Sequence, residues 1–164
     1  MTTRRMILAG GAAAAALCAL PLARGRAATA KTFAFTLTDP EWRSRLNPDQ
    51  YAVLREAATE RPFTSPLLNE HRKGLFSCAG CQADVFASQT KFNSATGWPS
   101  FHAPLAARAV GLTTDTSNYE VRQAVHCSNC GGHLGHLFID EPGPLGVRYC
   151  INGVALTFRP AARA

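Results

Sequence analysis

The chain has 164 residues, a length that fits one domain once any leader is removed. Of its 17 Lys and Arg residues four precede Lys31, whereas none of its 11 Asp and Glu residues does. From Lys31 onward the chain therefore carries 13 positive and 11 negative charges, a net charge of +2. It has no run of Lys or Arg of the kind that nucleic-acid binding needs, so nucleic acid is excluded as a partner.

The first thirty residues have the pattern of an export signal. Arg4 and Arg5 precede an uncharged stretch rich in Ala and Gly, Met6–Leu22, and an A-x-A cleavage pattern ends at Ala30. Paired arginines before a weakly hydrophobic core are typical of the twin-arginine route. We therefore expect 1–30 to be a cleaved signal peptide and the mature protein to be periplasmic or otherwise exported, without stable membrane association. The alternative is an uncleaved anchor, for which the stretch is short.

The region from 31 to about 70 is predicted to hold an extended arm and then short helices. The sequence TDPE at 38–41 fits a capping box for a helix that begins at Pro40, and NPDQ at 47–50 repeats the pattern. The two prolines of RPFTSP, 61–66, exclude a continuing helix there.

After Gly74 the sequence is typical of strands and turns. The residues of NYEVRQAVHC, 118–127, alternate between a more apolar and a more polar face, which predicts a strand. The stretches LFSC, ADVFA, HLFI and VRYCINGVALTFR are also strand-like, and no apolar period of helix length follows residue 74. We expect an all-β domain over 31–164 with a short N-terminal helical extension.

Four cysteines form two C-x-x-C pairs on turn-forming residues: Cys78, Cys81, Cys127 and Cys130. Two such pairs can present four thiolates to one tetrahedral Zn²⁺, which leaves no position for a substrate and makes the site structural. Two disulfides are the rival interpretation, since an exported protein meets oxidants. A pair of redox-active motifs would need a βαβ context that the sequence lacks. Cys18 lies in the leader after the bulky Leu17, which argues against a lipid-attachment site.

The remaining cysteine, Cys150, lies in the strand-like run GVRYCINGV. Because alternate residues of a strand share a face, Arg148 and Asn152 should lie on the same face as the thiol. The guanidinium group should then lower the pKa of Cys150 and raise its thiolate fraction. Taken alone, a cysteine in such a run is more often a buried structural thiol.

Two histidines and a tryptophan complete the candidate site. His133 and His136 are three residues apart in a strand, so both reach one site only if Gly135 marks a bend or a bulge. Imidazoles there could donate a proton to a leaving oxygen. Trp98 could form an aromatic wall for a methyl group, although a tryptophan is more often a core residue.

Four stretches together resemble the methionine-(R)-sulfoxide reductases of the B type: TERPFTSP, GLFSCAGCQADVFAS, KFNSATGWPSF and CSNCGGHLGHLFIDEPGPLGVRYCINGVALTF. The resemblance runs from about Asp39 to Phe158, and its most specific part is H-L-G-H-x-F followed by R-Y-C-I-N. It implies two antiparallel sheets, one structural zinc, and thiol-dependent reduction of methionine-R-sulfoxide, protein-bound or free, to methionine.

The resemblance also implies roles for single residues. Cys150 would be the nucleophile and would be left as a sulfenic acid. His133 and His136 would position water and supply the proton to the sulfoxide oxygen. Trp98 would pack on the methyl group of the substrate. Independently of the resemblance, we expect Trp98 and Phe101 to line a substrate pocket. Three further residues would orient the polar network: Asp140, Arg148 and Asn152.

One departure from the family concerns Thr96, because many members carry a resolving cysteine at this position. If the four paired cysteines hold zinc, no second thiol remains, and an external thiol must reduce the sulfenic acid. We expect a thioredoxin-like protein or another thiol as reductant, oxidised proteins as substrates, and a monomer. The competing hypothesis is a zinc-bearing β-fold that binds a ligand without chemistry.

Overall fold

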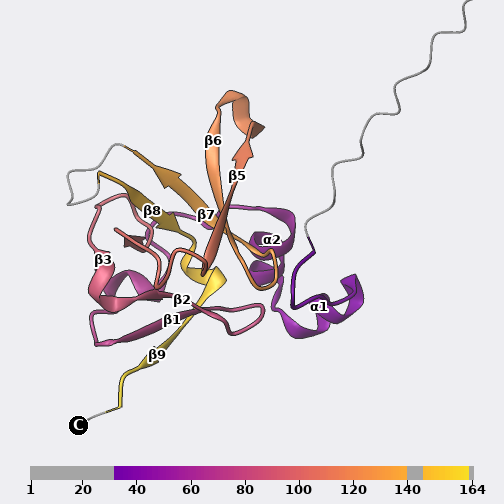
Figure 1. Ribbon diagram of the computed structural model, residues 1–164, viewed down its shortest axis with the longest axis horizontal. Helices are drawn as coiled ribbons and strands as arrows, with labels where there is room; N and C mark the ends of the chain where they lie inside the picture. The colour runs from indigo at the N-terminus through magenta and orange to yellow at the C-terminus, as the bar shows by residue number, and fades with distance from the viewer. Residues whose placement is uncertain (1–31, 140–145, 163–164) are drawn as a thin grey trace, which may run out of the picture. The chain divides into compact units, whose positions relative to one another are not determined.

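Two antiparallel sheets form the framework of the protein (Figure 1). The computed structural model describes residues 32–139 and 146–162, so the predicted leader with Cys18, and Asp140, lie outside the described residues. The smaller sheet has the strand order β2-β1-β9 and the larger one the order β3-β4-β8-β7-β6-β5. This confirms the expected all-β fold of two antiparallel sheets.

The strands have the following bounds. The smaller sheet comprises β1 (Gly74–Cys78), β2 (Asp84–Ala87) and β9 (Leu156–Pro160). The larger sheet comprises β3 (Lys91–Phe92), β4 (Ser100–Phe101), β5 (Val110–Asp115), β6 (Arg122–Cys127), β7 (His133–Phe138) and β8 (Arg148–Ile151). Four short 3₁₀ helices lie in the chain before and between these strands: η1 (Pro66–Asn69), η2 (Ser88–Thr90), η3 (Ser117–Tyr119) and η4 (Gly153–Ala155).

The two predicted helices are present, and their predicted capping boxes are confirmed. Thr38 caps α1 (Asp39–Arg45) with Glu41, and Asn47 caps α2 (Pro48–Glu56), its Oδ1 accepting from the backbone N–H of Gln50 at 2.8 Å. These side chains satisfy N–H groups that a helix start leaves without partners. Neither these helices nor any other within 32–139 and 146–162 is long and apolar enough to cross a membrane.

The strand predicted over 118–127 is shorter than the sequence pattern suggested. β6 begins only at Arg122, because residues 117–119 form the η3 turn and the backbone of Tyr119 has a φ of 61°. A left-handed residue cannot continue an extended strand. The turn joins β6 to β5, which lies at the edge of the larger sheet and was not predicted as a strand (Figure 1).

Aromatic rings fill the space between the sheets. Phe101 of the larger sheet lies fully buried, stacked on Phe86 with the ring centroids 4.4 Å apart and in edge contact with Phe76 at 5.1 Å. Burying each such ring stabilises the fold by about 2–3 kcal/mol. Phe101 is thus part of the core and presents no surface to a substrate, which differs from its expected place in the pocket.

The strand register explains this difference and defines the opposite face. Phe101 pairs with Tyr149, whereas its neighbour Ser100 pairs with Cys150, so Phe101 and Cys150 lie on opposite faces of the larger sheet. Cys150 also pairs with His136 across β7. Cross-strand partners point to the same side, so the thiol and the imidazole share the face turned away from the aromatic core. We call this the active face.

Candidate active site and metal centre

The two C-x-x-C pairs lie on hairpin turns of different sheets. Cys78 and Cys81 lie on the turn from β1 to β2, and Cys127 and Cys130 on the turn from β6 to β7. The four Sγ atoms lie within 4.8 Å of one another. All four cysteines are free thiols, so the two disulfides of the rival interpretation are not formed, and neither pair lies in a βαβ unit. The cluster could hold one structural zinc, which would join the two sheets.

Local backbone geometry turns the thiols toward one another. The residue after each pair has a left-handed backbone, Gln82 with φ 62° and Gly131 with φ 73°. Its N–H donates to the carbonyl of the first cysteine of the pair, at 2.8 Å for Cys78 and 2.9 Å for Cys127. A Cβ at Gly131 would overlap the ring of Phe33, so glycine is required there.

The helical extension supports both turns from the same side. The Nε of Arg45, at the end of α1, donates to the carbonyl of Gly80 at 2.6 Å. Arg55, near the end of α2, donates to the carbonyl of Cys130 at 3.3 Å. A Cβ at Gly80 would lie 3.6 Å from the Cδ1 of Leu54 in α2, which leaves little free volume around the cluster. Both helices thus bond to the turns that carry the four thiols.

Cys150 lies in the middle of the active face, flanked by β4 and β7. Its Sγ is 4.0 Å from the Oγ1 of Thr96. Burial raises the pKa of the Cys150 thiol, and Arg148, Thr96 and Ser100 oppose that rise without overcoming it. Arg148 favours the thiolate, as expected. The prediction that the pKa of Cys150 is lowered overall is wrong, because desolvation is the larger effect. The thiol of Cys150 is thus protonated at neutral pH.

A cluster of hydroxyl groups lies beside the thiol and was not foreseen from the sequence. The Oγ of Ser94 is 2.8 Å from the Oγ1 of Thr96 and 2.7 Å from the Oγ of Ser100. Ser100 is fully buried. The cluster links the loop before β4 to the sulfur of Cys150, and no spacing in the sequence signals it because Ser and Thr are common in loops.

A β-bulge brings the two histidines together. The register between β6 and β7 shifts by one residue at Leu134, so His133 and His136 fall on the same side of the strand. Their ring centroids are 5.2 Å apart, edge to face. The expected bulge is thus confirmed. The adjoining Gly135 is required for another reason, because a Cβ there would overlap the carbonyl oxygen of Cys150.

The two imidazoles have different environments. Burial, assisted by the neighbouring His136, lowers the pKa of His133 to about 4, so this ring is neutral at neutral pH. Its Nε2 is buried and bonds to no group in the described part of the protein. Such a nitrogen is suited to hold a water molecule or a ligand oxygen.

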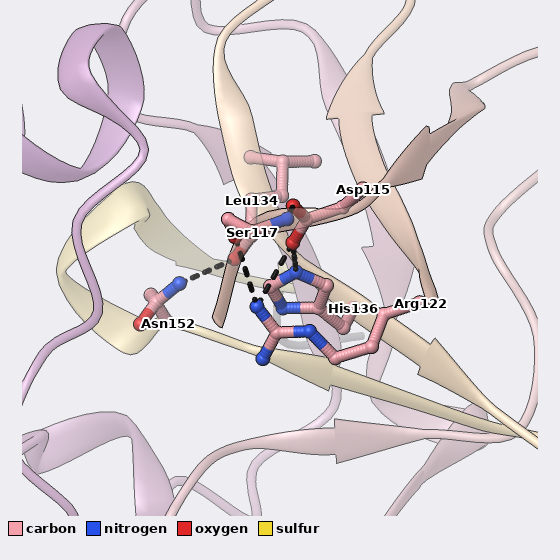
Figure 2. Close-up of polar contacts among 6 residues, drawn as sticks. All are labelled: Asp115, Ser117, Arg122, Leu134, His136 and Asn152. Carbon is pink, nitrogen blue, oxygen red and sulfur yellow. Dashed lines mark hydrogen bonds and ion pairs between the residues drawn. The ribbon is translucent and has the colours of Figure 1, made fainter. Parts of the chain in front are cut away.

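His136 instead has a carboxylate partner that the sequence did not reveal. Its Nε2 lies 2.7 Å from the Oδ2 of Asp115, at the end of β5 (Figure 2). Arg122 donates to the same oxygen at 2.9 Å, and the backbone N–H of Ser117 donates to Oδ1 at 2.9 Å. Hydrogen bonds from Ser117 and then His136 hold the pKa of the Asp115 carboxyl well below its usual range, so it is ionised.

Arg148 and Asn152 lie on either side of Cys150 in the chain and are both buried. The guanidinium group of Arg148 stacks over the ring of Phe138 with 4.5 Å from Cζ to the centroid. The Nδ2 of Asn152 donates to the carbonyl of Leu134, the bulge residue, at 3.0 Å (Figure 2). Asn152 therefore fixes the position of β7 relative to the end of β8.

Glu60 connects Trp98 to this arrangement and was missed in the sequence. Its carbonyl accepts from the Nε1 of Trp98 at 3.1 Å, and its N–H donates to the Oδ1 of Asn152 at 3.0 Å. Its carboxylate accepts from the N–H groups of Gly153 and Val154 at 2.6 and 2.8 Å. The indole is therefore held by Glu60, which also bonds to residues 152–154, just after Cys150.

A thiol, two imidazoles and an anchored indole thus lie on a double sheet whose four paired cysteines could hold zinc, and comparison with known proteins shows the family. Residues 46–160 match the SelR domain. The chain belongs to the SelR family. The peptide methionine sulfoxide reductase MsrB of Agrobacterium fabrum is 50% identical over 123 residues, which cover 75% of this chain and 91% of that protein. The protein of the same name from Methanosarcina barkeri is 49% identical over 122 residues, covering 74% and 86%.

Within this SelR-family protein, the structure brings most of the predicted site residues together. Cys150 and His136 are cross-strand partners, His133 shares their face, and Arg148 and Asn152 flank the thiol along the chain. Phe101 is in the core, and Asp140 lies outside the described residues. Among the described residues, Asp115, Glu60 and the hydroxyl cluster are the additions that the structure makes.

Replacing a metal ligand should remove the metal that would join the two sheets and so destabilise the fold. We predict that Cys130→Ser loses bound metal and lowers the melting temperature by at least about 10 °C, because a structural four-thiolate site contributes several kcal/mol to folding. Metal analysis and calorimetry check this, with Cys150→Ser as the matched control that keeps metal and stability. Less than about half a metal ion per wild-type chain would contradict the metal centre.

The buried imidazole of His133 should make the protein less stable in acid. The pKa of His133 falls from 6.5 to about 4 on folding. Its contribution to the free energy of unfolding is therefore complete above pH 6.5 and is lost as the pH falls to about 4. The loss amounts to at most about 3 kcal/mol. Denaturant unfolding at pH 7 and pH 4.5 should show a smaller acid loss for His133→Gln than for the wild type. An NMR titration midpoint of His133 above pH 6 would contradict the prediction.

Proposed function

We propose that the protein reduces methionine-R-sulfoxide to methionine with Cys150 as the nucleophile. The observation that carries this proposal is the pairing of Cys150 with His136 on one face, onto which a bulge also turns His133. The relatives named as peptide methionine sulfoxide reductases support it. A ligand-binding module without chemistry is not favoured, because binding alone needs no thiol opposite an imidazole.

The reductive step transfers one oxygen atom from the substrate to the enzyme. The sulfur of Cys150 attacks the sulfoxide sulfur while a proton is delivered to the sulfoxide oxygen, which is a poor leaving group until protonated. The sulfur–oxygen bond of the substrate breaks and one to Cys150 forms, so methionine leaves and Cys150 becomes a sulfenic acid. The sulfoxide sulfur gains two electrons and the cysteine sulfur loses them.

The surroundings of Cys150 suit this proton balance. Because burial raises the pKa of the thiol, its proton is still on the sulfur when the substrate arrives. The proton that Cys150 loses can be matched by the proton that the sulfoxide oxygen receives, with His136 as the donor. His133, neutral and with a buried unpartnered Nε2, positions the water or the oxygen. Arg148 stabilises the developing thiolate.

Other residues bind and orient the substrate. The indole of Trp98, held through Glu60, packs on the methyl group of the sulfoxide. Asn152 holds the bulge that presents the histidines. We retain Asp140 as a further orienting residue, by resemblance to the family. Zn²⁺ is the proposed metal at the four paired cysteines, where it would hold the two hairpin turns together and take no part in the reaction.

An external thiol returns Cys150 to its reduced state. Within the described residues the other cysteines form the metal cluster, and the position nearest to Cys150 carries the hydroxyl of Thr96. A reductant thiol attacks the sulfenic acid, water leaves, and a mixed disulfide forms; a second thiol then releases Cys150 and an oxidised reductant. A thioredoxin-like protein or a small thiol can supply both electrons.

The setting of the reaction follows from the sequence. We propose that the protein is exported by the twin-arginine route after folding, so that its thiols bind zinc before they meet an oxidising compartment. It would act there as a monomer on oxidised proteins, and on free methionine sulfoxide.

Replacing the nucleophile should abolish turnover without changing the fold. We predict that Cys150→Ser lowers kcat/KM for a peptide methionine-R-sulfoxide by at least about 10³-fold, since a hydroxyl cannot form the sulfenic acid. Activity is measured on separated R and S sulfoxides with dithiothreitol as reductant. Turnover by the variant, or equal turnover of the S sulfoxide by the wild type, would disprove the proposal.

A thiol at position 96 should change how the sulfenic acid is resolved. We predict that dimedone traps Cys150 in the wild type after one turnover, whereas Thr96→Cys forms an intramolecular disulfide, because the two side chains are about 4.0 Å apart. Mass spectrometry of the intact protein distinguishes the products. Thr96→Ser is the matched control and should behave as the wild type. An intramolecular disulfide to Cys150 in the wild type would refute external resolution.

A further inference from the structure

Asp115 is a carboxylate on the active face to which the proposed reaction gives no role. It lies at the end of β5, two strands away from β7, yet its Oδ2 is 2.7 Å from the Nε2 of His136. The residue between them explains this reach. Ala124 of β6 is the cross-strand partner of His136, and a side chain as small as that of alanine lets the imidazole extend over β6 toward β5. Figure 2 shows the imidazole of His136 reaching Asp115.

The carboxylate is held in a fixed orientation. Arg122, the cross-strand partner of Asp115, donates to Oδ2 at 2.9 Å, and the N–H of Ser117 donates to Oδ1 at 2.9 Å. Arg122 also donates to the hydroxyl of Ser117 at 3.4 Å. The side chains of Asp115 and His136 are largely shielded from solvent, so this hydrogen bond is weakly screened.

An ionised carboxylate can only accept hydrogen bonds. The proton at this contact must therefore sit on the Nε2 of His136, and the Nδ1 is the nitrogen left to exchange a proton with a reacting group. His133 has no such partner among the described groups at its Nε2, so the two rings are not equivalent.

We propose that Asp115 is a positioning residue that holds His136 with Nε2 protonated and leaves Nδ1 as its proton-exchanging nitrogen. The effect on rate rests on the proposed function, whereas the state of the ring does not. In sulfoxide reduction, this arrangement would orient the proton donor before the sulfur–oxygen bond breaks.

The first test reads the imidazole directly. Long-range ¹H–¹⁵N NMR spectra of the zinc-loaded protein should show His136 as the Nε2–H tautomer once the ring is neutral. In Asp115→Asn the amide can donate as well as accept, so the Nδ1–H tautomer should gain population. A wild-type His136 with the proton on Nδ1 would overturn the proposal, whether or not the variant folds.

The second test measures the consequence for catalysis. We expect Asp115→Asn to lower kcat by about 10²-fold and to change KM less than about 3-fold, because the loss falls on the proton donor and not on substrate binding. The matched control is Asp84→Asn. Asp84 of β2 likewise accepts from an arginine, Arg159 at 2.9 Å, and from the hydroxyl of Ser77, but lies in the other sheet.

The control variant should keep the wild-type kcat and the wild-type His136 spectrum. An Asp115→Asn variant with wild-type kcat, or an equal loss of kcat in Asp84→Asn, would overturn the proposal. The two failures are distinguishable. If the wild type reduces no sulfoxide, the proposed function fails, while the tautomer of His136 still decides whether Asp115 positions the ring.

Discussion

The extra residue in β7 is the constraint on which the active face depends. Without the bulge at Leu134, His133 and His136 would point to opposite faces, and one of them would displace the core. The bulge is held in place from β8, since the carbonyl of Leu134 accepts from both the backbone N–H of Asn152 at 2.8 Å and its Nδ2 at 3.0 Å. The turn of the same hairpin, between β6 and β7, carries the second cysteine pair. A bound metal would therefore fix the start of β7, next to the bulge.

This geometry gives the two histidines different chemistry. His133 is buried without a charged partner and stays neutral, whereas His136 reaches out over β6 to an ionised carboxylate. Neighbouring groups with environments that differ in this way commonly divide the roles of proton donor and hydrogen-bond partner. Cys150 adds a third group, a thiol that burial keeps protonated against the pull of Arg148. In the proposed reaction, the substrate oxygen would receive its proton among these three groups.

Local patterns in the sequence predicted much of the fold and part of the site. The capping boxes at 38–41 and 47–50, the two cysteine turns and the bulge beside Gly135 each depend on residues a few positions apart, and each was confirmed. Phe101 was wrongly predicted to line the pocket, because the face on which it lies depends on how β4 pairs with β8. In the structure it pairs with Tyr149 and so faces away from Cys150. Asp115 and Glu60 were missed because the site residues that they bind, His136 and Trp98, lie 21 and 38 residues away in the chain. Contacts between strands and loops that are distant in sequence leave no periodic signal.

The Cys150 thiol was also misjudged from sequence, and the reason bears on how the enzyme is reduced. A cation two residues away in a strand gives a thiol a lowered pKa only if its attraction for the thiolate exceeds the cost of desolvating it, and here burial outweighs Arg148. The same burial restricts access to the sulfenic acid after turnover. Because Thr96 offers a hydroxyl and not a thiol at 4.0 Å, a reductant must bring its own sulfur into the half-buried site. A narrow thiol, or a protein thiol on an exposed turn, would meet that requirement.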